Sequence, residues 1–156
     1  MCLGKRIKIM DNSWKSNYFI GTNLWYAPIL GSVGEGGDRE RLGRELDRLN
    51  ELGIKNIRIL AGADGLCMEN KMRPILHTEP NTYDQDLLDG LDFVMKELSD
   101  RNMQAVLYFN NSWEWSGGVM EYLRWTSGVE APYPHLFGYP EYEKYCSQWC
   151  INKTAQ

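Results

Sequence analysis

The residues with the clearest potential for chemistry follow directly on an apolar run, residues 105–109. Two amides, Asn110 and Asn111, come first, and a carboxylate, Glu114, then lies between Trp113 and Trp115. A tryptophan ring can cover the C–H face of a pyranose while amides hydrogen-bond to its hydroxyls. The pattern therefore indicates a carbohydrate-binding edge at the end of a buried strand.

Two further candidates occupy comparable places earlier in the chain. Trp25 follows a predicted strand over residues 18–23, and Arg58 lies between Ile57 and Ile59. An arginine flanked by buried strand positions needs a carboxylate partner or a ligand. Arg58 is therefore simply exposed at an edge, part of a structural ion pair, or a ligand contact. Trp25 is either packing at the top of the sheet or an outer sugar-binding position.

The other candidates also have structural alternatives. Trp113 and Trp115 could both belong to the core, although the serines and glycines around them favour at least one sugar platform. Asn110 and Asn111 could only cap the strand, but adjacent strand residues point to opposite sides, so one amide can face a cleft. Glu114 resembles a catalytic acid, yet retaining glycoside cleavage needs two carboxyls about 5 Å apart. No second carboxyl is evident nearby in the sequence, so we predict a loop role for Glu114.

The elements that must position these residues alternate between strand and helix. Strands are predicted at residues 18–23, 54–60 and 103–109, after a small hairpin over residues 7–20. The first helix has its N-cap at Asp38 and its stop at Gly53, and its apolar stripe consists of Leu42, Leu46, Leu49 and Leu52. A third helix is expected over residues 141–156. The connection over residues 117–140 is expected to be a long loop, which either forms a wall of the substrate groove or packs against the domain without contacting substrate.

The second helix is predicted to open with a capping box over residues 82–85. Its inward stripe consists of Leu87, Leu91, Val94, Met95 and Leu98. The β-α-β-α-β-α order implies right-handed crossovers and a parallel sheet, either open and doubly wound or part of a (β/α)8 barrel. The glycine-rich residues 31–37 fit neither a phosphate loop nor a dinucleotide motif, which favours the barrel. A full barrel needs about 250 residues, so this chain supplies roughly the first three of its units.

Composition sets limits on the function class. The 156 residues are 43% hydrophobic and 24% charged with a formal net charge of −4, which is ordinary for a globular protein and gives no electrostatic footprint for nucleic acid. Four cysteines, at positions 2, 67, 146 and 150, lack metal-binding spacing, so we expect no metal and no cofactor. The sequence contains no transmembrane run and no recognisable signal peptide, so no membrane partner is expected.

Three segments in combination resemble the endo-β-1,4-mannanases of glycoside hydrolase family five: residues 19–26, 34–42 and 110–118, with Arg58 matching that family's strand-two arginine. The resemblance implies a (β/α)8 barrel that cleaves β-mannan with retention, using one glutamate as acid/base and another as nucleophile. It places Arg58 at the cleaved bond and aligns Trp113 with the active-site tryptophan, leaving Trp115 as the fallback. It also implies a secreted or periplasmic protein.

The two catalytic motifs of that family are not found in these residues. Its acid/base follows an asparagine in an Asn-Glu-Pro motif, whereas the Glu79-Pro80 pair here is preceded by Thr78. We therefore expect residues 1–156 to be an incomplete N-terminal part of a single barrel domain that binds β-mannan or manno-oligosaccharides but is inactive alone. The alternatives are a cellulase-like β-glycanase of the same fold and a non-catalytic carbohydrate-binding module.

Overall fold

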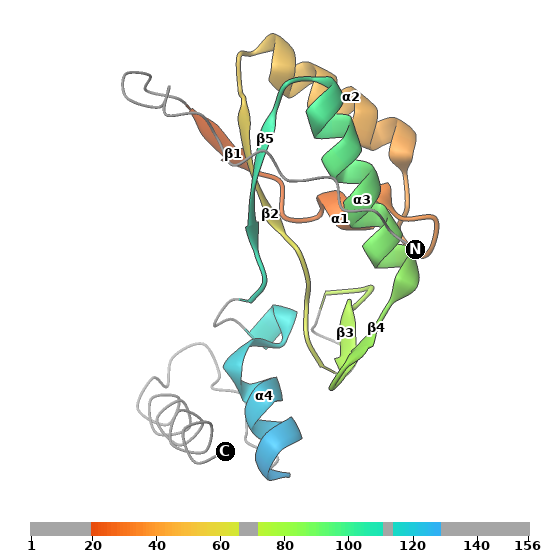
Figure 1. Ribbon diagram of the computed structural model, residues 1–156, viewed down its shortest axis with the longest axis vertical. Coiled ribbons are helices and arrows are strands. Elements are labelled where there is room, and N and C mark those ends of the chain that lie inside the picture. Colours follow the sequence, from red (N-terminus) through yellow and green to blue (C-terminus); the bar gives the residue numbers. More distant parts are fainter. Residues whose placement is uncertain (1–19, 66–71, 111–113, 129–156) are drawn as a thin grey trace, which may run out of the picture.

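The chain is organised around a small parallel sheet. The computed structural model describes residues 20–65, 72–110 and 114–128. Its main sheet contains β1 (Gly21–Asn23), β2 (Asn56–Leu60) and β5 (Gln104–Tyr108), which are parallel and lie in that order (Figure 1). The predicted N-terminal hairpin and the predicted helix over residues 141–156 lie outside the described residues.

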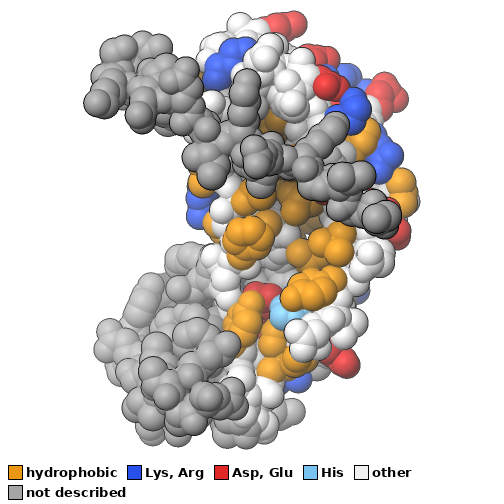
Figure 2. All heavy atoms as spheres, in the orientation of Figure 1, with side chains coloured by type: hydrophobic (Ala, Val, Ile, Leu, Met, Phe, Trp, Pro, Cys, Tyr) orange, Lys and Arg blue, Asp and Glu red, His pale blue; other side chains and the backbone are white. Residues whose placement is uncertain are grey.

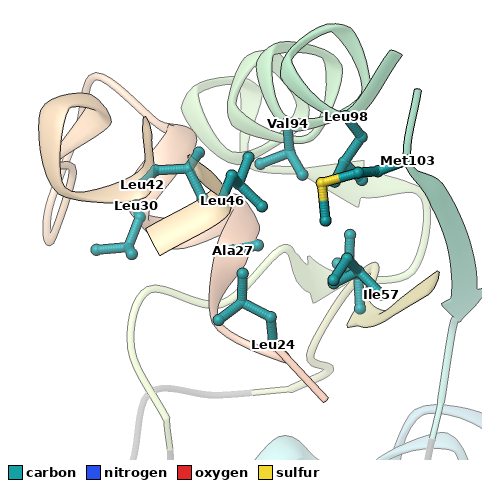
Figure 3. Packing of buried hydrophobic residues seen from close by; sticks show 10 residues of the cluster. Leu24, Ala27, Leu30, Leu42, Leu46, Ile57, Val94, Leu98 and Met103 are labelled. Atoms are coloured by element: carbon teal, nitrogen blue, oxygen red, sulfur yellow. The ribbon is translucent and has the colours of Figure 1, made fainter. Parts of the chain in front are cut away.

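Helices cover one face of this sheet. The short helix α1 (Ala27–Gly31) and the longer helices α2 (Arg39–Glu51) and α3 (Gln85–Asp100) pack against Ile57 of β2 (Figures 1 and 3). The core cluster contains Leu24, Ala27, Leu30, Leu42, Leu46, Ile57, Ile59, Val94, Leu98 and Met103. The sequential strand order and the one-sided helical layer confirm the predicted partial barrel and exclude the doubly wound alternative.

The opposite face of the sheet carries a different set of side chains. Asn23, Arg58 and Val106 are aligned across the three strands, between positions whose side chains point to the helices. Val106 is 49% exposed, so this face is open within the described part of the chain. The alternation on β2, with Ile57 and Ile59 fully buried and Arg58 exposed, separates the packing face from the face available to a ligand.

Helix α2 begins and ends where its capping residues predict. The Asp38 side chain accepts a hydrogen bond from the Arg41 N–H at 2.8 Å, and Gly53 adopts φ +77° after the helix. Leu52 was expected to pack inward but is 62% exposed, because the helix ends at Glu51 and Leu52 is its C-cap.

The capping prediction for α3 was wrong by two residues. Asp84 is the N-cap and accepts from the Leu87 N–H at 2.9 Å, while Thr82 and Tyr83 form β4 (Thr82–Tyr83). That strand pairs antiparallel with β3 (His77–Glu79), a hairpin that the sequence analysis did not predict. Met95 is 38% exposed and does not join the inward stripe.

The segment after β5 is more regular than expected. A 3-10 helix, Glu114–Ser116, precedes α4 (Gly118–Ser127), so the first part of the predicted loop is helical. Gly117 precedes this helix at φ +95°, and Gly128 ends it in a left-handed conformation. Within the described ranges, the structure contains no helix long and apolar enough to cross a membrane.

Candidate functional site

Arg58 lies on the open face of the sheet, where its guanidinium carbon is 3.6 Å from the centre of the Tyr108 ring. Arg58 is paired with Val106 in the sheet register, and Tyr108 is two residues farther along the same face of β5. A guanidinium over an aromatic face gains cation–π stabilisation and is held in one plane. The ring thus orients the arginine while leaving its N–H donors available at the edge of the stack.

Two predicted tryptophans meet beside the strand ends. The rings of Trp25 and Trp115 are 5.1 Å apart with an edge-to-face angle of 65°, and Trp25 also contacts Tyr26 at 5.4 Å. The Leu24 N–H donates to the Arg58 carbonyl at 2.9 Å, which fixes the start of this segment against β2. The structure therefore places Trp25 beside Trp115 as a half-buried aromatic pair.

A polar cluster that the sequence analysis missed lies next to these strand ends. Asp64, only 4% exposed, accepts hydrogen bonds at its Oδ1 from the Tyr122 hydroxyl and from His77 Nδ1, both at 3.1 Å. The Asn81 N–H donates to His77 Nε2 at 3.2 Å, so the proton of the neutral ring belongs on Nδ1. Burial raises the pKa of Asp64, the hydrogen bonds from His77 and Tyr122 oppose that shift, and the charge of Glu121 adds to it.

Aromatic rings surround this cluster. His77 stacks on Tyr83 with centroids 4.7 Å apart and an interplanar angle of 10°, and Trp125 meets His77 edge-on at 4.7 Å. Tyr122 and Trp125 are 5.3 Å apart. Figure 2 shows hydrophobic side chains gathered around the histidine on this face, next to a hollow. The rings restrict the rotamers of His77 and Tyr122 and keep water from Asp64.

The Tyr122 phenol of this cluster has a raised pKa. Burial raises the pKa of the Tyr122 phenol to about 12, the charge and hydrogen bond of Asp64 act in the same direction, and a side-chain hydrogen bond with Asn110 opposes them. Asn110 itself is exposed. Asn110 was predicted from the sequence but the polar cluster was not, because Asp64, His77 and Tyr122 are distant in sequence and none belongs to a recognisable motif.

The structure describes only some of the remaining predicted site residues. Asn111 and Trp113 lie outside the described residues, so their place in the site stays a prediction. For Glu114 only the backbone is described, in the 3-10 helix. In the part of the chain that the structure covers, no three or more His, Cys, Asp or Glu side chains are grouped so as to hold a metal ion.

The titration of Tyr122 provides a direct test of the cluster. We expect its phenol to titrate at about 12, above the ordinary value of 10.0. Because the folded-state pKa is raised, the associated stabilisation is complete below pH 10 and is lost as the pH rises through 12. Asp64→Asn should lower the Tyr122 pKa, since the neighbouring charge disappears. Ring carbon NMR, with Tyr122→Phe to assign the signal, measures both values, and a Tyr122 signal that titrates at the ordinary value contradicts the cluster.

Comparisons with known proteins identify the family to which the chain belongs. The family model described as GH family 5 beta-mannosidase-like matches residues 6–156. A putative mannan endo-1,4-beta-mannosidase 9 from Oryza sativa is 30% identical over 79% of this chain and 28% of its own length. A family 5 mannosidase variant from Rhizomucor miehei, solved with mannosyl-fructose, aligns at TM-score 0.77 and 34% identity, covering 85% of this chain and 33% of that chain.

A more distant structure supports the fold alone. An endo-1,4-beta-D-mannanase from Thermotoga petrophila aligns at TM-score 0.53 and 21% identity, covering 85% of this chain and 37% of that chain. Against the rice relative and the fungal mannosidase, the 156 residues span about a third or less of the other protein's length.

Proposed function

The chain belongs to the β-mannosidase-like group of glycoside hydrolase family 5, and from this premise we propose that it contributes the sugar-binding edge of an endo-β-1,4-mannanase. The observation that carries the proposal is the stack of Arg58 on Tyr108 at 3.6 Å, on the open face of a parallel sheet. In barrels of this kind the binding site lies at the carboxyl ends of the strands. Arg58 is the middle residue of β2, but its guanidinium stacks on Tyr108, the last residue of β5, and Asn110 follows that strand.

These residues suit a sugar ring with many hydroxyls. The guanidinium offers several N–H donors in a fixed plane, and the Asn110 amide offers both a donor and an acceptor. Trp25 and Trp115 supply flat apolar surface next to them. We propose that Arg58 donates to a mannose hydroxyl and that the tryptophan pair covers a neighbouring ring, with Asn111 and Trp113 completing the edge.

Cleavage of the substrate requires catalytic groups in addition to a binding surface. Retaining hydrolysis requires an acid that protonates the leaving oxygen and a second carboxylate that attacks the anomeric carbon. The 156 residues contain no Asn-Glu-Pro motif, and Glu79 belongs to β3 rather than to the sheet that carries Arg58. We propose that this stretch binds and orients the substrate and does not by itself hydrolyse it.

The test combines binding with turnover. We expect the purified 156-residue chain to bind mannohexaose in calorimetry more tightly than cellohexaose, and to release no reducing ends from soluble β-mannan. A family 5 mannanase that carries both glutamate motifs serves as the positive control for turnover. Preference for cellohexaose supports the cellulase-like alternative, and turnover by this chain that is lost in Glu114→Gln overturns the assignment of Glu114.

A second candidate has a specific observation in its favour. The Rhizomucor miehei relative is a mannosidase solved with mannosyl-fructose, a short ligand. An enzyme for short mannosides needs few subsites, whereas an endo-acting enzyme binds a long chain. Binding that is as tight for mannobiose as for mannohexaose supports the short-mannoside enzyme, and a steady gain in affinity with length supports the endo-mannanase.

A further inference from the structure

The Tyr83 ring on the β3–β4 hairpin is stacked on a histidine and open to solvent. Tyr83 of β4 is paired with His77 of β3, and the two rings lie nearly parallel, with centroids 4.7 Å apart and an interplanar angle of 10°. His77 covers one face of the phenol ring, while Tyr83 as a whole remains 47% exposed. In Figure 2 the hydrophobic side chains around this histidine border a hollow. The hairpin therefore presents a flat apolar ring to solvent.

The histidine behind this ring is fixed at both of its nitrogens. His77 Nδ1 lies 3.1 Å from Asp64 Oδ1, and His77 Nε2 accepts a hydrogen bond from the Asn81 N–H at 3.2 Å. The edge of the Trp125 ring meets the histidine with the centroids 4.7 Å apart. Rotation of His77 would break both hydrogen bonds in a largely buried site. The plane of the Tyr83 ring is therefore set before any ligand arrives, which lowers the entropic cost of binding.

The hairpin is joined to the proposed sugar-binding edge through Asp64. Asp64 and His77 form a parallel bridge, in the stretch of chain that leaves the carboxyl end of β2. The Asp64 N–H also donates to the Ser116 carbonyl at 3.0 Å, next to Trp115. Asp64 therefore connects the support of Tyr83 to the segment that carries Trp115.

We propose that Tyr83 is a further sugar platform, on which an additional mannosyl unit of a bound β-mannan chain stacks. This inference rests on the proposed sugar-binding function and extends the binding surface beyond the pair of Trp25 and Trp115. On one face of a β-mannosyl ring only C–H bonds project, and that face matches the flat apolar surface of an aromatic ring. The platform binds by apolar contact and adds to the hydrogen bonds that Arg58 donates.

Substitutions that remove or keep the ring test the platform by calorimetry. Tyr83→Ala should weaken mannohexaose binding by about three- to tenfold, because the stacking surface is lost. Tyr83→Phe is the matched control, since it keeps the ring and removes only the hydroxyl, and its affinity should stay within about twofold of the wild type. An affinity of Tyr83→Ala within about twofold of the wild type overturns the proposal. An equal loss in Tyr83→Phe and Tyr83→Ala also overturns it, because the hydroxyl and not the ring would then bind the ligand.

A titration of the wild-type chain makes the test independent of how the variants fold. The NMR signals of the Tyr83 ring, assigned with Tyr83→Phe, should shift on addition of mannohexaose with the midpoint that calorimetry gives for binding. Tyr83 signals that stay unmoved at saturating mannohexaose overturn the platform and leave the proposed function intact. A wild-type chain that binds no tested mannoside overturns the proposed function, and the platform with it.

Discussion

Gly117→Ala is expected to destabilise the folded chain by about 3 kcal/mol or more, the largest stability effect that we predict for one added methyl group. Gly117 has φ +95°, which L side chains rarely adopt, and its added Cβ would lie 2.0 Å from the Asp64 carbonyl oxygen. That oxygen belongs to backbone, and the Asp64 N–H is bonded to the Ser116 carbonyl at 3.0 Å, so the two segments cannot separate without losing this bond.

Gly128→Ala is the matched control for this prediction. Gly128 also has a positive φ, +67°, but a Cβ there meets nothing within 4 Å. It should therefore cost only the left-handed conformational penalty, about 1 kcal/mol. Urea unfolding followed by tryptophan fluorescence measures both variants. Equal losses in the two would mean that φ alone matters and that the close approach of Gly117 to Asp64 does not exist.

The parts of the fold that sequence predicted correctly are those encoded locally. Asp38 and Gly53 bracket α2 because capping depends only on residues within one turn of the helix end. The strands around Ile57 and Ile59 were recognisable because alternation is a property of a few adjacent residues. The alternation of these strands and helices along the chain was also enough to predict that the three strands are parallel and adjacent in sequence order, with the helices on one face.

The parts that sequence missed depend on distant partners. Thr82 has the spacing of a helix cap, but pairing of β4 with β3 competes successfully for it, and Asp84 caps α3. Asp64 and Tyr122 meet only because α4 returns to the loop after β2. Nothing near either residue in the sequence indicates that Asp64 will accept a hydrogen bond from Tyr122.

The partner of Arg58 illustrates the same limit. The sequence left three alternatives for Arg58, namely simple exposure, a structural ion pair and a ligand contact. The register of β2 with β5 instead brings the Tyr108 ring diagonally across to the guanidinium. The face is open within the described residues, so the charge is not desolvated, and the stacked guanidinium keeps N–H donors for the proposed ligand.

Arg58→Ala is expected to weaken mannohexaose binding by at least about tenfold while leaving stability nearly unchanged. A charged donor to a sugar hydroxyl contributes about 1.5–3 kcal/mol, which corresponds to roughly a 10- to 150-fold change in affinity. Stability should change little because Arg58 is exposed and its guanidinium stacks on the Tyr108 ring at the surface of the sheet. Arg58→Lys should recover part of the affinity, since lysine keeps the charge but lacks the planar fork that stacks on Tyr108.

Arg44→Ala provides the control for loss of a positive charge. The Arg44 side chain is 62% exposed on α2 and pairs with Glu40 within the helix, away from the strand ends. Calorimetric titration with mannohexaose, beside urea unfolding of each variant, separates affinity from stability. If Arg44→Ala and Arg58→Ala weaken binding equally, the effect is general electrostatics. If Arg58→Ala unfolds the chain, then Arg58 is a structural residue and the binding edge must be sought elsewhere on the open face.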